Sequence, residues 1–284
     1  MVFSVETNRQ LLASDFLPPC DGPKLHAFKG KNASIKWIKR LGSPPSPESG
    51  CQSYVFKVET QSQTYALKIF KFSPPCDPRS LLGPIRGEAV EKEDVVFHTD
   101  PFYAECRAYG RIQDAYGTRR PKMPCVADCY GFLALSEADR RYLADQGIDP
   151  CCDLSPDDKY RAIADKSPVR ALVKEYVRDN SILDDKIAER IRRGILFVNK
   201  IGILIRDVRL DNYVGGMLVD LGSSWTKPHC ILDNTKYLLK EWEWADRVMF
   251  NDMLEEEGIQ PRVPGMQVTS VIDSSSTRAR LVEK

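Results

Sequence analysis

The stretch IRDVRLDN at residues 205–212, followed by DLG at residues 220–222, decides how the whole chain is interpreted. Asp207 and Asn212 are five positions apart, so both side chains are expected on one loop. Two glycines after Asn212 predict a tight hairpin that brings Asp220 back beside it. Phosphoryl transfer from ATP needs an acceptor for a hydroxyl proton and oxygen ligands for Mg²⁺. Asp207 is therefore a candidate general base, and Asn212 and Asp220 are candidate Mg²⁺ ligands.

This stretch resembles the H-R-D-x-x-x-x-N catalytic loop and the D-F-G motif of protein kinases. Upstream, ALKI at residues 66–69 resembles the V-A-I-K motif of that family, and VKEYV at residues 173–177 resembles its hinge. The resemblance covers about residues 35–257. A single motif of this kind is weak. These four motifs together with Glu105, on the helix after residues 66–69, make five in the order of the family, and that combination is specific.

The resemblance implies ATP and Mg²⁺ as cofactors, and it assigns a role to each matching residue. The implied catalytic residues are Asp207, Lys68, Glu105 and Arg209, the nucleotide-binding residues are Gly50, Val55, Ala66, Lys68, Glu175 and Val177, and the metal ligands are Asn212 and Asp220. Lys68 is expected to contact the phosphates and to pair with Glu105. Taken alone, a lysine like Lys68 is more often a solvated edge-strand residue, and Asp207 could simply be a turn former.

The remaining sequence predicts an α+β chain with the two-lobe protein-kinase-like fold. Alternating segments at residues 35–41, 54–59 and 64–70 predict an antiparallel meander. Residues 126–135 and 169–177 are two further strand candidates, which completes a five-stranded antiparallel N-lobe sheet.

Three longer segments predict helices. Asp100 before Pro101 is typical of a helix N-terminus, and this helix is expected to run to about residue 117. Apolar residues recur at helical spacing within residues 184–200, which predicts an amphipathic helix. A last helix is expected over residues 235–257.

The expected organisation follows from these elements. It comprises a lead-in segment at 1–23, an N-lobe at 24–177 with insertions at 71–100 and 136–167, a truncated helical C-lobe at 178–257 and a mobile tail at 258–284. The first insertion is rich in Pro, Gly and charge and is expected to be a loop. Nothing after Glu257 resembles the further helices of a kinase C-lobe. The platform that holds a peptide substrate is therefore expected to be missing.

Four positions depart from the kinase pattern. Only Gly50 stands where the family has three glycines, and Ile205 replaces the histidine of the catalytic loop. Arg209 takes the place of a lysine that touches the γ-phosphate, and it keeps the charge but not the shape. Lys174 occupies the gatekeeper position, which is normally apolar, so it must find an anion or reach solvent.

The composition is ordinary for a globular protein and excludes few functions. Of 284 residues, 42% are hydrophobic, and the formal net charge of +1 gives no drive toward nucleic acid or membrane. No apolar run approaches the ~20 residues that span a bilayer, and the N-terminus does not resemble a secretory signal. Nine cysteines, an odd number, are typical of free thiols in a reducing compartment. An intracellular location is expected.

A narrower resemblance explains the unusual positions. The segments DPFYAECRAYGR at 100–111, NYVGG at 212–216 and SWTKPH at 224–229 resemble a filamentous-fungal kinase-like family labelled as a kinetochore subunit of the Sim-four complex (Fta-two-like). That label implies a nuclear, centromere-associated role with protein partners at the kinetochore. Without it, a cytoplasmic location is expected.

Three functions remain open on the sequence. The first is an atypical ATP-dependent phosphotransferase, which the complete set of phosphate and metal ligands favours. The second is a pseudokinase scaffold at the kinetochore or centromere, which the degraded glycine loop and the missing platform favour. The third is a small-molecule kinase of the aminoglycoside or choline type, which shares the Asp-x-x-x-x-Asn spacing and the later Asp.

Overall fold

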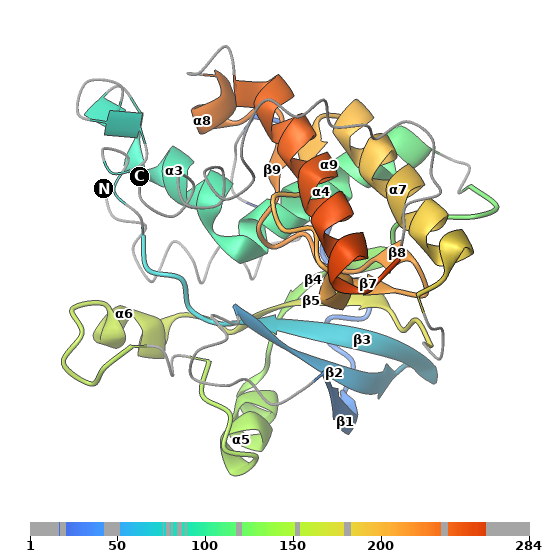
Figure 1. Cartoon of the computed structure of the whole chain (residues 1–284). Helices are drawn as coiled ribbons and strands as arrows, with labels where there is room; N and C mark the ends of the chain where they lie inside the picture. Colours follow the sequence, from blue (N-terminus) through green and yellow to red (C-terminus); the bar gives the residue numbers. More distant parts are fainter. Residues whose placement is uncertain are drawn as a thin grey trace.

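A computed structural model gives the arrangement of the chain. It describes residues 17, 21–42, 52–75, 77, 80, 82–83, 87–88, 90–117, 121–150, 154–178, 183–233 and 238–259. Within these residues a β-rich half and a helical half lie against each other (Figure 1). The fold is α+β and has the two-lobe protein-kinase-like arrangement that the sequence predicted.

The β-rich half is built on one five-stranded antiparallel sheet. Its strands, in the order β1-β2-β3-β5-β4, are β1 (Lys36–Leu41), β2 (Ser53–Thr60), β3 (Gln63–Phe70), β5 (Arg170–Glu175) and β4 (Cys129–Ala134). Gln61 and Ser62 join β2 to β3 with φ of 50° and 61°, the conformation of a two-residue turn that suits the strand twist. All five expected strands are present: β2 and β3 extend slightly beyond the expected bounds, and β1, β4 and β5 are shorter than expected.

The two faces of the sheet serve different purposes. Alternate residues of β2 and β3, such as Phe56, Val58 and Leu67, are buried in one apolar cluster on the first face. The opposite face carries the site residues, because cross-strand partners share a face: Val55 is paired with Lys68, and Ala66 is paired with Lys174.

The first face is covered by the segment that the sequence predicted to be an insertion. Residues 136–167 contain α5 (Glu137–Asp145) and α6 (Arg161–Lys166), which lie on the side of the sheet away from the other helices (Figure 1). Leu143 of α5 is fully buried in the cluster, and Tyr142 stacks on Trp37 of β1 with ring centroids 4.8 Å apart. This insertion therefore completes the core of the β-rich half.

The helical half holds α3 (Lys92–Thr99), α4 (Pro101–Tyr116), α7 (Asp185–Lys200), α8 (Cys230–Asp233) and α9 (Leu238–Glu256). Two short strand pairs lie between α7 and α8, namely β6 (Ile203–Leu204) with β9 (Trp225–Thr226) and β7 (Tyr213–Val214) with β8 (Met217–Leu218). The main core cluster joins α4, α7 and α9.

One expectation for this half needs correction. Residues 71–100 were expected to be a loop, but Lys92–Thr99 forms α3, whose residues Val95 and Phe97 are buried. The last helix, expected over about 235–257, is present as α9 at Leu238–Glu256, and residues 234–237 between α8 and α9 lie outside the described residues. The lead-in residues 1–16 and the tail from residue 260 lie outside the described residues.

Candidate functional site

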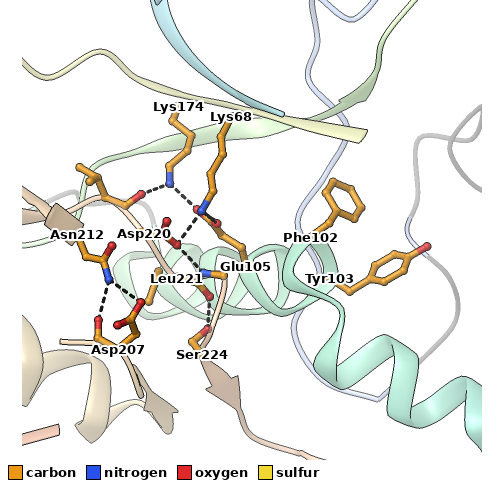
Figure 2. A network of polar contacts seen from close by, with 12 residues as sticks. Lys68, Phe102, Tyr103, Glu105, Lys174, Asp207, Asn212, Asp220, Leu221 and Ser224 are labelled. Carbon is orange, nitrogen blue, oxygen red and sulfur yellow. Dashed lines mark hydrogen bonds and ion pairs between the residues drawn. The ribbon is translucent and has the colours of Figure 1, made fainter. Parts of the chain in front are cut away.

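An ion pair between the sheet and α4 forms the centre of the site. Lys68, on β3, places its Nζ 2.6 Å from Oε2 of Glu105, which lies in the second turn of α4 (Figure 2). The same Nζ lies 2.7 Å from Oδ1 of Asp220. Lys68 is 3% exposed and Glu105 is 0% exposed, so the pair is shielded from water. The ion pair expected from the sequence is present, and it joins both halves of the fold.

α4 is positioned for this contact by its own N-terminus. Asp100 caps the helix by accepting hydrogen bonds from the backbone N–H groups of Phe102 and Tyr103. Its second carboxylate oxygen lies 2.8 Å from the guanidinium of Arg170 at the start of β5. The cap therefore ties the beginning of α4 to the same sheet that carries Lys68.

Lys174, the residue at the gatekeeper position, is directed into the same cluster. Its Nζ contacts Oε1 of Glu105 and donates to the backbone carbonyl of Val219 (Figure 2). It also lies 4.8 Å from the ring centroid of Tyr109. The sequence required Lys174 to find an anion or reach solvent, and Glu105 is that anion. One buried carboxylate thus bridges two lysines.

Asp220 is the solvent-facing member of the cluster. Its Oδ1 accepts the backbone N–H of Gly222 at 2.8 Å, and its side chain is 36% exposed. Burial alone would raise the pKa of Asp220, but the ammonium groups of Lys68 and Lys174 and the Gly222 N–H hold that pKa below its ordinary value. Asp220 is therefore ionised at neutral pH.

Gly222 leaves room beside this carboxylate. A Cβ at this position would lie 3.3 Å from Asp220 Oδ1, which is a tight contact. The Gln52 side-chain oxygen at 3.4 Å and Lys68 Nζ at 3.5 Å are at ordinary van der Waals distances. An added side chain would therefore press mainly on the Asp220 carboxylate, which would have to shift by a few tenths of an ångström.

Asp207 and Asn212 lie beside Asp220 on the loop after β6. Asn212 Nδ2 donates to the backbone carbonyl of Asp207 at 2.8 Å and to its Oδ2 at 3.1 Å (Figure 2). The β7–β8 hairpin then returns the chain, and the Val219 N–H donates to the Asn212 carbonyl at 2.8 Å. The hairpin predicted from the glycine pair therefore places Asp220 beside Asn212. Arg209 Nε lies 3.5 Å from Asp207 Oδ2, and the Asp207 side chain is 37% exposed.

The oxygen atoms of this loop fit a hard divalent cation. Because the amide nitrogen of Asn212 is directed to Asp207, the amide oxygen remains as an acceptor. Asp220 uses Oδ1 for Lys68 and Gly222, which leaves Oδ2. Carboxylate and carboxamide oxygens are ligands that Mg²⁺ takes in proteins. Asn212 and Asp220 are thus the residues that could hold Mg²⁺, and Lys68 is the residue that could hold a phosphate.

The expected nucleotide-binding residues are only partly brought together. Val55 and Ala66 share the sheet face of Lys68. At the hinge, the Glu175 carboxylate accepts the backbone N–H of Asp128 at 3.1 Å, so its side chain braces the sheet. Val177 is the second residue after β5 and is partly buried. Gly50, the single glycine of the degraded loop, lies outside the described residues.

Asp246, which was not predicted from the sequence, holds the backbone of residues 205 and 206 in place. It lies in the middle of α9, is 0% exposed, and accepts the backbone N–H groups of Ile205 at 2.9 Å and Arg206 at 2.7 Å. Asn199 of α7 donates to the same carboxylate at 2.8 Å. Burial raises the pKa of Asp246 to about 6 despite these hydrogen bonds. A lone acidic residue among the apolar positions of a helix was the available signal.

Arg206 shows why such an anchor is needed. Its φ is 66°, in the left-handed region that non-glycine residues rarely adopt. Its guanidinium lies 3.7 Å from the ring centroid of Trp225 and 4.8 Å from that of Trp242, and it donates to the Ser223 carbonyl at 3.1 Å. Burial lowers the pKa of Arg206 to about 10, so it stays charged. Both tryptophans are buried packing residues.

The segment after the DLG motif is held against α4 by arginines that the sequence analysis did not assign. Arg107 is 1% exposed and donates to the backbone carbonyls of Asp21, at 2.8 Å, Thr226, at 3.2 Å, and Pro228. Arg111, one turn further, donates to the Lys227 carbonyl at 2.6 Å. The helix that presents Glu105 is thereby attached to residues 226–228.

The fold and this cluster of lysines and carboxylates define a protein-kinase-like domain. The family model described as Kinetochore Sim4 complex subunit FTA2 matches residues 14–225, which is more than half of the chain. The chain belongs to this family. No curated protein matches it.

Two solved structures are similar in fold at low identity. A structure of vaccinia related kinase 3 has a TM-score of 0.36 and 13% identity, and the match covers 78% of this chain and 56% of the other. A structure of the Neurospora crassa PAN3 pseudokinase mutant has a TM-score of 0.37 and 10% identity, with 97% and 58% covered. The chain thus spans little more than half the length of either.

Proposed function

We propose that this chain is a kinase-like kinetochore subunit that binds ATP between its sheet and the loop of residues 205–222. The observation that carries the proposal is the meeting of Lys68, Glu105 and Asp220 within ion-pair distance. Asp207 and Asn212 lie on the adjoining loop. An ammonium group supports phosphate binding, and the oxygens of Asn212 and Asp220 support Mg²⁺ binding.

Nucleotide binding is tested by thermal stabilisation. At 100 times the dissociation constant, a ligand that binds only the folded protein adds about 2.7 kcal/mol to the free energy of unfolding. We expect ATP to stabilise the wild type and to have little effect on Lys68→Met. Lys36→Met is the matched control, because the Lys36 side chain is 72% exposed on β1. Equal stabilisation of all three proteins, or none of any, would contradict nucleotide binding at this site.

Phosphate transfer to a hydroxyl is the extension of this proposal. The Asp207 carboxylate is exposed enough to receive a proton and has Arg209 beside it. Incubation with labelled ATP and Mg²⁺ or Mn²⁺ tests transfer, and Asp207→Asn is the variant that should lose it. Turnover that survives in Asp207→Asn would remove Asp207 as the base.

A scaffold role at the nuclear kinetochore is the second candidate, and membership of the Sim4-subunit family favours it. In this role the ion-paired cluster fixes the two halves of the fold and the surface binds protein partners. A fluorescently tagged chain should then concentrate at centromeres even when it carries Asp207→Asn. A diffuse distribution of the wild-type chain would contradict this role. No helix among the described residues is long and apolar enough to cross a membrane.

A further inference from the structure

The charges at the centre of the site sum to zero. Two lysines, Lys68 and Lys174, face two carboxylates, Glu105 and Asp220. With an apolar residue at position 174, as the kinase pattern has it, the same cluster would carry one net negative charge. Relative to the apolar residue of the kinase pattern, Lys174 therefore changes the charge of the site as well as the shape of the side chain.

Lys174 is only 3% exposed, and its side-chain nitrogen is surrounded by groups of the protein. Its ammonium contacts a carboxylate oxygen of Glu105, the Val219 carbonyl and the face of the Tyr109 ring. Each of these groups stabilises a positive charge. The fold thus provides a binding environment for the ammonium group of Lys174.

The charge of Lys174 affects Asp220, the exposed member of the cluster, through the other ion pairs. Lys174 binds one oxygen of Glu105 and Lys68 binds the other. Because Lys174 balances the charge of Glu105, the charge of Lys68 balances that of Asp220. Negative charge attracts a divalent cation to Asp220, and in this site the lysines already balance the negative charge, so the attraction is weaker than in the kinase pattern. Positive charge attracts a metal-free triphosphate, and this site has one ammonium group more than the kinase pattern, so that attraction is stronger.

We propose that Lys174 makes nucleotide binding nearly independent of divalent metal, so that the site accepts a nucleoside triphosphate with or without Mg²⁺. Its ammonium is turned toward Glu105 and Val219, so Lys174 is a positioning residue that acts through the other charges. The inference rests on the proposed nucleotide binding and specifies the form of nucleotide that the site takes.

The test compares the dissociation constant of ATP in excess EDTA with that in excess Mg²⁺, by titration calorimetry. The ratio of the two constants is expected to stay within about threefold for the wild type. Lys174→Gln removes the charge and can still hydrogen-bond to Glu105 and Val219. In this variant the ratio should rise at least about tenfold, with weaker metal-free binding. Lys174→Arg, which keeps the charge, and Lys36→Met, which loses one on the surface, should resemble the wild type.

The ratio separates an electrostatic role from a structural one. Damage to the fold weakens both constants together and leaves their ratio unchanged, and that result in Lys174→Gln would overturn the inference. A wild-type ratio above about tenfold would overturn it without any variant, so the test stands even where Lys174→Gln does not fold. ATP that fails to bind the wild type in either buffer would instead refute the proposed function itself.

Discussion

Glu105→Gln removes one negative charge from between two buried ammonium groups and changes little else, because glutamine has nearly the same shape as glutamate. Lys68 keeps Asp220 at 2.7 Å as a partner. Lys174 loses its anionic partner and keeps the uncharged contacts with the Val219 carbonyl and the ring of Tyr109. Breaking a buried ion pair by removing one partner costs about 3–5 kcal/mol. Since one of the two lysines retains a carboxylate, we expect a loss of about 3 kcal/mol in the free energy of unfolding.

Urea denaturation followed by tryptophan fluorescence measures this loss. Glu59→Gln is the matched control: Glu59 is 37% exposed and lies 3.4 Å from Lys36 on the surface, where an ion pair contributes less than about 1 kcal/mol. The double variant Glu105→Gln with Lys174→Met removes the stranded cation together with its anion. It should be more stable than Glu105→Gln alone, so the two changes should not add. A single-variant loss below about 1 kcal/mol, or strict additivity, would show that Glu105 does not stabilise the fold by neutralising Lys174.

Two further predictions concern the anchors of the site. Because burial raises the pKa of Asp246 from 3.8 to about 6, the folded state keeps a proton that the unfolded state loses between these values. The free energy of unfolding should therefore fall by about 3 kcal/mol as pH rises from about 4 to 6 and then level off. The Asp246→Asn variant should lack this pH dependence. A pH dependence that persists in the variant would show that other groups cause it. Arg107→Met leaves three carbonyls without their charged donor and should lower the free energy of unfolding by about 2–4 kcal/mol. Arg111→Met removes one such bond and should lower it by about 1 kcal/mol. Similar losses for the two variants in urea denaturation would show that the carbonyl contacts do not set the stability.

The sequence predicted those parts of the site that depend on local order along the chain. The spacing of Asp207 and Asn212 and the glycine hairpin placed Asp220 correctly, because a tight turn leaves few paths for the returning strand. The Lys68–Glu105 pair was found through the resemblance to kinases, since nothing in strand or helix periodicity links two residues 37 positions apart.

The contacts that the sequence left undetermined join distant elements. Lys174 could be given two outcomes, an anion or solvent, but the choice of Glu105 depends on how β5 lies against α4. Asp246 and Arg107 bind backbone groups, and the residue types in the sequence do not show which backbone groups are bound. The helices within residues 136–167 were not predicted, because few of their residues are apolar and α5 packs partly on distant strands, as where Tyr142 stacks on Trp37 of β1.

α4 carries Glu105 toward the lysines and Arg107 toward the segment at 226–228, so it is held from two directions at once. Swinging this helix outward would break the salt bridge and the arginine's carbonyl contacts in the same movement, each worth about 1.5–3 kcal/mol for a charged partner. A ligand can select only a conformation that the free protein already populates to some degree. Compounds that need this helix displaced beside the proposed nucleotide site should therefore bind weakly. Compounds that bind while the helix is in its inward position require no such displacement.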